Sequence, residues 1–346
     1  MPRVNGDTFV SYAQNGEDVL LWRALGHVDD GRYVDVGAWD AVSDSVTKAF
    51  YDRGWRGVDV EPVPELADAL RAARPGDEVV RAAVTASDDT ELVLHRVVAT
   101  GAEGDTTGLS TLLDDIAHEH AGEGFEVQEV VVPTTRLAAV CDAEVLGGTI
   151  HFLKIDVEGA EADALRSMDF ERHRPWIVVV EATRPNSTEP SHEEWEGLLL
   201  AAGYEFAIFD GLSRYYVASE RPELLPALSY PVCVFDRYTT YAAAQQAAEL
   251  DALRAAHAET TAENGRLWTD LTHWRGVALD RWSQGFKERE RLEKRLAAMK
   301  KRNVERAVTQ RQELRDLRDR IDRIENSSSW RVTKPLRWAR SKAPGQ

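Results

Sequence analysis

The sequence has few of the features that would indicate a disulfide framework, a zinc site or a membrane span. It holds only two cysteines among 346 residues, Cys141 and Cys233, and they lie too far apart to form a metal-ligand motif. We interpret both as buried, reduced thiols. No apolar run reaches the roughly 18 residues of a spanning helix, and the opening stretch MPRVNGDTFVSYAQNGEDVLLW lacks the apolar core of a secretion signal. The chain is therefore expected to be cytoplasmic.

A glycine-rich turn for binding phosphates is also missing. The segment YVDVGAWD, residues 33–40, has the pattern of a buried strand followed by a turn, but Gly37 is its single glycine. A pyrophosphate cofactor needs several glycines so that the backbone can approach its phosphates. Because the chain also lacks a Tyr-x-x-x-Lys pair for proton relay, a nicotinamide-dependent sugar oxidoreductase is disfavoured.

Positive charge is scarce in the first part of the chain and abundant in the rest. Residues 1–240 contain 19 Lys and Arg against 44 Asp and Glu, whereas residues 241–346 contain 23 against 15. An acidic body repels nucleic-acid phosphates, so we expect no nucleic-acid partner. We divide the chain into a domain of residues 1–240, a helical region of residues 241–326 and a basic tail of residues 327–346.

Short apolar runs typical of strands alternate with stretches of helical spacing through the first part of the chain. The strand-like runs lie at residues 32–36, 55–62, 78–85, 150–159 and 175–183, and a last pair lies at 204–211 and 213–219. This alternation predicts an α/β fold with a doubly wound, mostly parallel sheet that has helices on both faces. The last pair, joined at Asp210-Gly211, is expected to form an antiparallel hairpin at one edge.

We make separate predictions for two of the connecting segments. In AVSDSVTKAFYDRG, residues 41–54, we predict a helix that begins with Ser43 or Asp44 as its N-cap and ends at Gly54. Residues 99–135 are rich in glycine and acids, and they interrupt the alternation. We interpret them either as a lid or substrate loop or as a disordered surface excursion.

Acidic side chains follow the predicted strands at the edge where an open parallel sheet binds its ligands. They are Asp35, Asp40, Asp59, Glu61, Asp156, Glu158 and Glu181. Such acids would repel a pyrophosphate, but they suit the sulfonium, amino-acid head and ribose hydroxyls of S-adenosylmethionine. Glu61 follows Gly37 by 24 residues, near the roughly 20-residue offset at which an acid meets ribose hydroxyls in dinucleotide folds. The candidate cofactor-binding residues are Asp35, Gly37, Asp40, Glu61 and Asp156.

Several segments, in this order, resemble a known family. SYAQNGEDVLLWRAL, YVDVGAWDAVSDSVTKAFYDRGWRGVDVEPVPEL, LSTL, FLKIDVEGAEADAL and VVVEAT are similar to the FkbM family of S-adenosylmethionine-dependent O-methyltransferases, over roughly residues 11–218. The resemblance implies a seven-stranded Rossmann-like methyltransferase sheet and methyl transfer to a hydroxyl, often of a sugar or natural product. It places Asp35 and Gly37 in the cofactor turn, Glu61 at the ribose, and Asp156 with Glu158 at the active-site face. Trp39 departs from the small residue or Asn that many members carry there.

Methyl transfer to a hydroxyl calls for a proton acceptor within hydrogen-bond reach. Asp156 is the first candidate, followed by Glu158, Glu181 and His192, although Asp156 would serve equally well as the N-cap of the helix after it. Paired acids such as Asp156 and Glu181 could also hold a divalent cation. That alternative is not favoured, because the chain has no compact ligand motif.

Two polar segments have a functional and a structural interpretation. The cluster at residues 14–18 precedes an apolar helix, either as a lid over the cofactor or as an ordinary helix cap. The segment LST, residues 109–111, would supply contacts to the site or simply form a turn. The resemblance favours the lid.

The last hundred residues predict a helical extension. Leu314, Leu317, Ile321 and Ile324 recur at heptad spacing and predict a weak coiled coil, through which we expect a homo-oligomer. The tail segment SSSWRVTKPLRWARSK interleaves tryptophans with basic residues and contains no acid. It suits either peripheral contact with the inner face of a membrane or docking to another protein, and it resembles the endings of bacterial glycan-assembly proteins.

The leading functional hypothesis is an O-methyltransferase that acts on a sugar hydroxyl of a surface glycan or its precursor. The alternative is a non-catalytic glycan-assembly scaffold, in which the methyltransferase domain is degenerate and the coiled coil carries the function.

Overall fold

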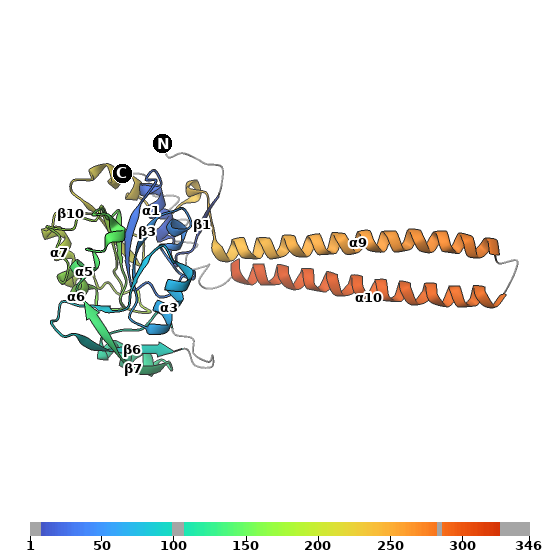
Figure 1. The fold of residues 1–346 in the computed structure, drawn as a ribbon, viewed down its shortest axis with the longest axis horizontal. Coiled ribbons are helices and arrows are strands. Elements are labelled where there is room, and N and C mark those ends of the chain that lie inside the picture. The colour runs from blue at the N-terminus through green and yellow to red at the C-terminus, as the bar shows by residue number, and fades with distance from the viewer. Residues whose placement is uncertain (1–7, 99–106, 282–285, 326–346) are drawn as a thin grey trace. The chain divides into compact units, whose positions relative to one another are not determined.

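The computed structural model describes residues 8–98, 107–281 and 286–325 (Figure 1). Two compact units divide the chain, one running through Thr240 and the other beginning at Tyr241, and each is described by itself. Within the described ranges, no helix combines the length and the apolar character that crossing a bilayer would need. Cys141 and Cys233 are free and buried, as expected from the sequence.

A seven-stranded sheet forms the centre of the first unit. Its strand order is β10-β11-β9-β8-β2-β3-β4. The strands are β2 (Arg32–Val36), β3 (Arg56–Val60), β4 (Glu78–Val80), β8 (Phe152–Ile155), β9 (Ile177–Glu181), β10 (Tyr204–Phe209) and β11 (Ser213–Ala218). Strand β11 is antiparallel to both of its neighbours, and the other pairs are parallel. The predicted mostly parallel α/β sheet with a hairpin at one edge is confirmed.

Two apolar layers cover the two faces of this sheet. Because successive strand side chains point to opposite faces, Tyr33 and Val34 belong to different apolar clusters. The layer of Tyr33 includes side chains from α1, α2 and α8, whereas the layer of Val34 includes side chains from α5, α6 and α7. The helices are α1 (Glu17–Leu25), α2 (Lys48–Tyr51), α3 (Pro64–Ala73), α5 (Leu137–Val140), α6 (Glu161–Arg166), α7 (Glu196–Ala201) and α8 (Leu225–Leu228).

Short elements complete the first unit. The 3-10 helices are η1 (Glu144–Leu146), η2 (His192–Glu194), η3 (Pro222–Leu224) and η4 (Val234–Asp236). Strands β1 (Phe9–Ser11) and β12 (Tyr238–Thr240) form a separate parallel pair. This pair joins the beginning of the unit to its end.

The predicted helix at residues 41–54 is wrong for its first part. Helix α2 begins only at Lys48, and neither Ser43 nor Asp44 caps it. The side chain of Arg74 explains the difference, because it donates hydrogen bonds to the carbonyl oxygen of Ala41 at 2.8 Å and to Oγ of Ser45 at 2.6 Å. These long-range bonds hold the segment in an irregular path that a helix would not allow.

The segment that interrupts the alternation is largely folded. Strands β5 (Ala83–Val84), β6 (Glu91–Val98) and β7 (Glu126–Thr135) form a three-stranded sheet in the order β5-β7-β6, and α4 (Asp114–Gly122) lies between β6 and β7 in the chain. Leu94 and Val132 pack with Val63, the residue before α3. Residues 107–135 are therefore not a disordered excursion, and residues 99–106 lie outside the described ranges.

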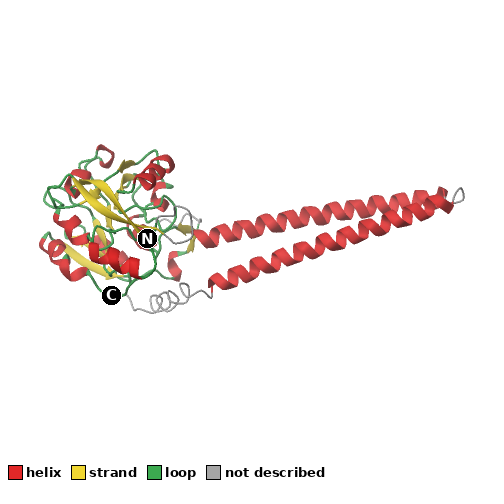
Figure 2. Ribbon diagram, turned by 90° about the horizontal axis from the view of Figure 1, so that it is seen from below, coloured by secondary structure: helices red, strands yellow, loops and turns green. Residues whose placement is uncertain are grey.

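The second unit consists of two long helices, α9 (Tyr241–Arg281) and α10 (Phe286–Glu325), which lie side by side (Figures 1 and 2). They are antiparallel, because Lys300 lies 5.1 Å from the ring centre of Trp268 and Arg306 lies 3.9 Å from Glu263. Lys300 and Asn303, which lie two heptads before Leu314 and Leu317 and so continue the predicted seam, line a groove shared with α9. Part of the seam thus contacts a helix of the same chain, and the predicted homo-oligomer stays a prediction.

Trp282, the side chain of Ile324 and the basic tail lie outside the described part.

Candidate active site

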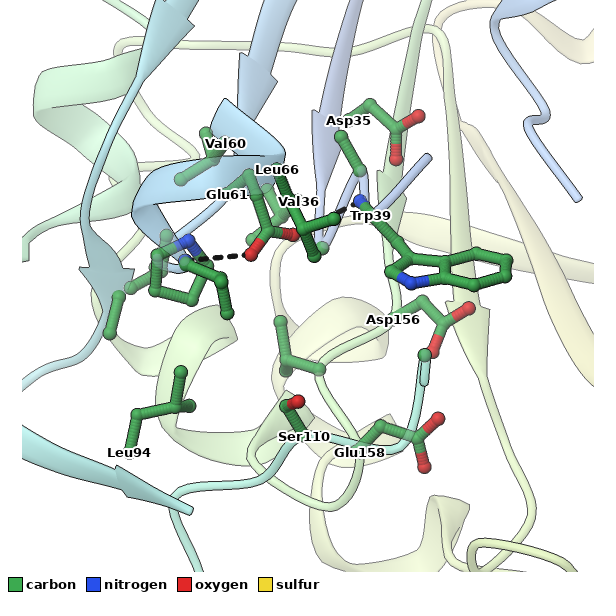
Figure 3. A pocket seen from close by; sticks show the side chains of 18 of the residues that line it. Asp35, Val36, Trp39, Val60, Glu61, Leu66, Leu94, Ser110, Asp156 and Glu158 are labelled. Atoms are coloured by element: carbon green, nitrogen blue, oxygen red, sulfur yellow. Dashed lines mark hydrogen bonds between the residues drawn. The ribbon is translucent and has the colours of Figure 1, made fainter. Parts of the chain in front are cut away.

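A pocket opens at the carboxyl ends of β2, β3 and β8 (Figure 3). The strand order reverses between β2 and β8, which is where open α/β sheets bind their ligands. The wall consists of residues 35–39 after β2, residues 61–63 after β3, residues 156–158 after β8 and residues 107–110 ahead of α4. The interrupting segment therefore contributes to the site, as its interpretation as a lid or substrate loop predicts.

Gly37 brings the turn after β2 into close contact with the turn after β8. Its φ is +82°, and a Cβ atom built on it would lie 1.8 Å from the carbonyl oxygen of Asp156. The N–H groups of Gly37 and Ala38 both donate to the carbonyl oxygen of Val60, at 3.0 and 3.1 Å. One glycine therefore suffices here, because only one residue needs both the left-handed conformation and the close approach.

Glu61 presents a buried carboxylate to the pocket. Its Oε2 accepts the N–H of Trp39 at 3.0 Å, and its Oε1 accepts the N–H of Val63 at 2.8 Å (Figure 3). The side chain is only 4% exposed, and burial raises the pKa of Glu61 to about 7. Each carboxylate oxygen keeps a second lone pair, so the group can still accept hydrogen bonds from two hydroxyls.

Trp39 is a wall of the pocket. Its φ of 47° is unusual for a bulky residue, and the hydrogen bond from its N–H to Glu61 holds this conformation in place. The indole lies close to Gly108, where an added Cβ would be 3.6 Å from the ring, and Figure 3 shows it beside Asp156. The residue that departs from the family pattern thus still shapes the site.

Lys154 joins two of the predicted site residues. Its Nζ lies 3.5 Å from Oδ1 of Asp35 and 3.2 Å from Oδ2 of Asp156, and it donates to the carbonyl oxygen of Gly37 at 3.2 Å. Burial by itself would lower the pKa of Lys154, but Asp156 and Asp35 raise it overall, so the side chain stays cationic. The sequence contained the signal that would have identified it, a charged residue within the buried strand FLKI.

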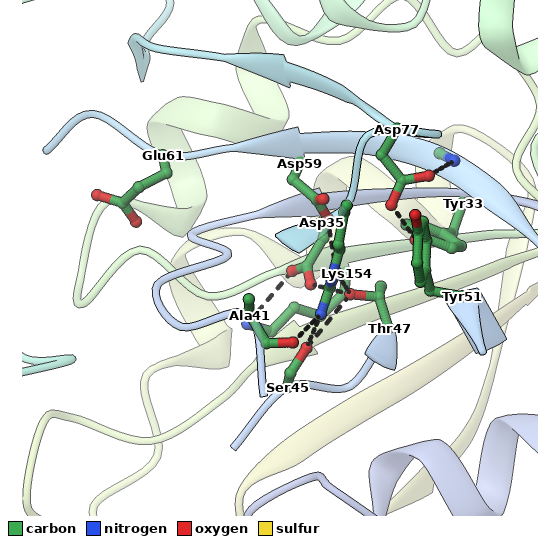
Figure 4. Close-up of polar contacts among 12 residues, drawn as sticks. Tyr33, Asp35, Ala41, Ser45, Thr47, Tyr51, Asp59, Glu61, Asp77 and Lys154 are labelled. Atoms are coloured by element: carbon green, nitrogen blue, oxygen red, sulfur yellow. Dashed lines mark hydrogen bonds and ion pairs between the residues drawn. The ribbon is translucent and has the colours of Figure 1, made fainter. Parts of the chain in front are cut away.

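Asp59 is one of the strand-end acids, but its side chain lies in the protein interior and not in the pocket. It lies 3.2 Å from Nη1 of Arg74, and neither side chain lines the pocket. Arg74 also donates to Oγ1 of Thr47, which in turn donates to Asp35 (Figure 4). This fully buried network connects the end of α3 to β2 and β3 and positions Asp35.

Three predicted catalytic residues come together at the ends of β8 and β9. Asp156, Glu158 and Glu181 each offer a carboxylate oxygen that lies within 4.8 Å of the other two. Burial, followed by the charge of Asp156, raises the pKa of both glutamates well above its ordinary value. Asp156 and Glu158 line the pocket, whereas Glu181 is 9% exposed and lies behind them.

The alternative role of Asp156 as a helix N-cap is wrong. Helix α6 begins at Glu161, whose Oε1 accepts the N–H groups of Val157 at 3.2 Å and Gly159 at 3.0 Å. These two N–H groups of the loop are therefore satisfied by Glu161 and not by Asp156. The Asp156 side chain lines the pocket instead.

Two other predicted residues lie elsewhere. The Oδ1 of Asp40 accepts the N–H groups of Val42 at 2.7 Å and Ser43 at 2.6 Å, so this carboxylate caps a turn and is not a pocket-lining residue. His192 lies on η2, with Nε2 4.0 Å from a carboxylate oxygen of Glu196, and it does not line the pocket either.

The polar segments at residues 14–18 and 109–111 each have a residue in the pocket wall and another with a structural contact. Gln14 and Ser110 line the pocket. Thr111 instead donates its hydroxyl to the carbonyl oxygen of Glu158 at 2.8 Å, which fixes the loop that carries the acids. Asp18 accepts hydrogen bonds from the Ser11 hydroxyl and the Tyr12 N–H, which tie the end of β1 to α1. Among the described residues, no side chain caps the start of α1, whose N-cap residue is Gly16.

The strand order with its antiparallel β11, the pocket at the switch point and the acid after β3 define a Rossmann-like methyltransferase. Residues 35–206 match the model of the methyltransferase FkbM domain, and this part of the chain belongs to that family. The chain is a methyltransferase whose methyl donor is S-adenosylmethionine. The pocket fits this group, because the Glu61 carboxylate can receive ribose hydroxyls and the acids Asp35 and Asp156 in its lining suit a positively charged sulfur.

Several solved structures show a distant likeness. A TehB-like S-adenosylmethionine-dependent methyltransferase from Corynebacterium glutamicum is 8% identical, with a TM-score of 0.32 over 58% of this chain and 87% of that one. An O-methyltransferase from Bacillus cereus, solved in complex with SAH, is 11% identical, with a TM-score of 0.28 over 62% and 85%. Fibrillarin from Methanococcus jannaschii is 10% identical, with a TM-score of 0.29 over 63% and 87%. No curated protein is similar enough to match the chain.

Proposed function

We propose that the chain transfers the methyl group to a hydroxyl of a sugar, in a surface glycan or its precursor. The observation that carries this proposal is the convergence of Asp156, Glu158 and Glu181 beside the pocket. Carboxylates accept hydrogen bonds from the neighbouring hydroxyls of a sugar, and one of them can take a proton. The basic tail, with its resemblance to glycan-assembly proteins, supports the same class of acceptor.

The pocket residues divide into those that hold the cofactor and those that act on the acceptor. Glu61 would bind the ribose hydroxyls, Gly37 would allow the amino-acid head to lie against the backbone, and Trp39 would cover one side. When bound, S-adenosylmethionine supplies a methyl group on a positively charged sulfur. The acidic lining of the pocket favours that charge.

Asp156 is the residue that we expect to accept the hydroxyl proton. It lines the pocket, its side chain is 31% exposed, and Lys154 holds one of its oxygens at 3.2 Å. The other oxygen can receive a hydroxyl. Lys154 thereby positions the proton acceptor.

The test uses purified protein, S-adenosylmethionine with a labelled methyl group, and glycan fractions from cells that do not make this protein. We expect transfer of one methyl group, and we expect Asp156→Asn to lower kcat by about 10²–10⁴-fold while S-adenosylmethionine binding, measured by calorimetry, stays close to that of the unaltered protein. An unchanged kcat would remove Asp156 from this role. If no glycan accepts a methyl group, the acceptor class is wrong, and the non-catalytic scaffold would regain support.

A further inference from the structure

We propose that Asp156, Glu158 and Glu181 form a binding site for one divalent cation of the kind that prefers oxygen ligands, such as Mg²⁺, Mn²⁺ or Ca²⁺. Each residue offers a carboxylate oxygen within 4.8 Å of the other two. Three carboxylates with no nitrogen or sulfur ligand are the donor set of hard cations, rather than of zinc or copper. The sequence suggested a cation only as an unfavoured alternative at Asp156 and Glu181, because no compact ligand motif marks the site; the structure adds Glu158 and brings the three acids together.

An independent observation is that one carboxylate oxygen of each glutamate lacks a partner. Oε2 of Glu158 and Oε2 of Glu181 are buried, and neither has a hydrogen-bond partner among the described residues. Glu181 is only 9% exposed, so water does not compensate for the missing bonds. A cation between the three residues would satisfy both oxygens at once.

The local charge balance also calls for a cation. Lys154 is shared between Asp156, at 3.2 Å, and Asp35, at 3.5 Å. In the ranges that the structure describes, no ion pair reaches the carboxylate of Glu158 or Glu181. One lysine therefore faces four acids, and a divalent ion would offset the remaining charge.

The backbone holds the three carboxylates in this arrangement. Glu158 has a φ of 51°, which an ordinary residue adopts only at a cost of about 1 kcal/mol or more. The Thr111 hydroxyl holds the carbonyl oxygen of Glu158 from one side, and Glu161 holds the N–H groups of the loop from the other. Glu181 ends β9, where its register partner is Ser213 on β11. The loop that carries Asp156 and Glu158 is thus held by hydrogen bonds, and Glu181 is held by the sheet, so the ligands are brought together by the fold.

The position of the site suggests what the ion does. Asp156 and Glu158 line the pocket, so a cation bound to them would lie where an acceptor hydroxyl arrives. A hard cation that contacts a hydroxyl oxygen lowers the pKa of that hydroxyl. This role rests on the proposed function, whereas binding of the ion does not.

The experiment measures Mn²⁺ binding to the full chain, stripped of metal with a chelator, by the loss of the electron paramagnetic resonance signal of free Mn²⁺. We expect one saturable site per chain, from which Mg²⁺ displaces Mn²⁺. Glu181→Gln and Glu158→Gln should each weaken binding by about tenfold or more. Glu205→Gln is the matched control, because Glu205 is an exposed glutamate on β10 of the same sheet. It should bind Mn²⁺ as the unaltered chain does.

The outcomes separate the site from the function. The proposal is overturned if the chain shows no saturable Mn²⁺ binding, or if both Gln variants bind as tightly as the control, since the acids would then hold only protons. S-adenosylmethionine binding by calorimetry should persist in Glu181→Gln, because Glu181 does not line the pocket. Methyl transfer without Mn²⁺ binding would refute the metal site and support the proposed function. Mn²⁺ binding without methyl transfer to any hydroxyl would support the metal site and refute the proposed function.

Discussion

Replacing Glu61 by glutamine tests whether this carboxylate binds the cofactor. Both of its oxygens accept backbone N–H groups, from Trp39 at 3.0 Å and Val63 at 2.8 Å. The side-chain amide of the Glu61→Gln variant has one oxygen and can accept only one of them, so one buried N–H loses its partner, at a cost of about 1–3 kcal/mol in stability. The ribose hydroxyls would also lose a charged acceptor, which is worth roughly 1–2 kcal/mol more than a neutral one. We therefore expect Kd for S-adenosylmethionine to rise by about 5–30-fold.

Isothermal titration calorimetry at pH 8 measures this change. Glu65→Gln is a suitable control, because Glu65 lies on the first turn of α3, four residues away, and its side chain is 67% exposed. We expect the control to bind S-adenosylmethionine normally. A folded Glu61→Gln variant whose Kd stays within about twofold of the control would refute the assignment of Glu61 to the ribose.

The pH dependence of binding gives a second measurement of the same idea. Burial raises the pKa of Glu61 to about 7, so the side chain is largely protonated below that pH. Hydroxyls donate to the charged form, and binding must then release the proton. The affinity should fall by about tenfold per pH unit below pH 7 and level off above it. Glu61→Gln should lose this dependence, and a pH profile shared by both proteins would contradict the explanation.

Three further predictions concern stability and are measured by urea unfolding. Gly37→Ala should lower the free energy of unfolding by about 3 kcal/mol or more, because the Cβ of the alanine would lie 1.8 Å from the carbonyl oxygen of Asp156. Arg74→Met should lower the free energy of unfolding by about 3–5 kcal/mol, because the buried carboxyl group of Asp59 loses its partner whether it is charged or protonated. Burial, and then Asp210, raises the pKa of Glu17 from 4.5 to about 8. The folded state holds this proton more tightly than the unfolded chain, so the free energy of unfolding should decrease as the pH rises from 4.5 to 8. Glu17→Gln should flatten that slope by up to about 1.4 kcal/mol per pH unit.

Matched substitutions make these three predictions specific. Gly54 also has a positive φ, +93°, but nothing lies within 4 Å of an added Cβ, so Gly54→Ala should cost only about 1–2 kcal/mol. Arg71 lies three residues before Arg74 and forms an exposed pair with Asp68, so Arg71→Met should change stability by less than about 1 kcal/mol. Equal losses within either pair would contradict the structural explanation. For Glu17, an unchanged pH slope in the glutamine variant would do so.

The strand-end acids show how far the sequence could predict the site. Asp35, Glu61 and Asp156 all line the pocket, because the carboxyl ends of parallel strands meet at one edge whatever the strand order. Asp40 and Asp59 look the same in the sequence, but one caps a turn and the other pairs with Arg74. The difference lies in side-chain partners that come from distant parts of the chain, which local patterns do not encode.

The sequence by itself determined the alternation of strands and helices, the acidic body and the single glycine of the turn after β2. These properties depend on residues close together in the chain, through side-chain periodicity and backbone conformation. Only the tertiary structure decided that Trp39 forms a wall of the pocket and that Lys154 links Asp35 to Asp156. The convergence of Glu181 with Asp156 likewise depends on the pairing of β8 with β9. That pairing follows from packing across the whole sheet, so no local pattern could reveal it.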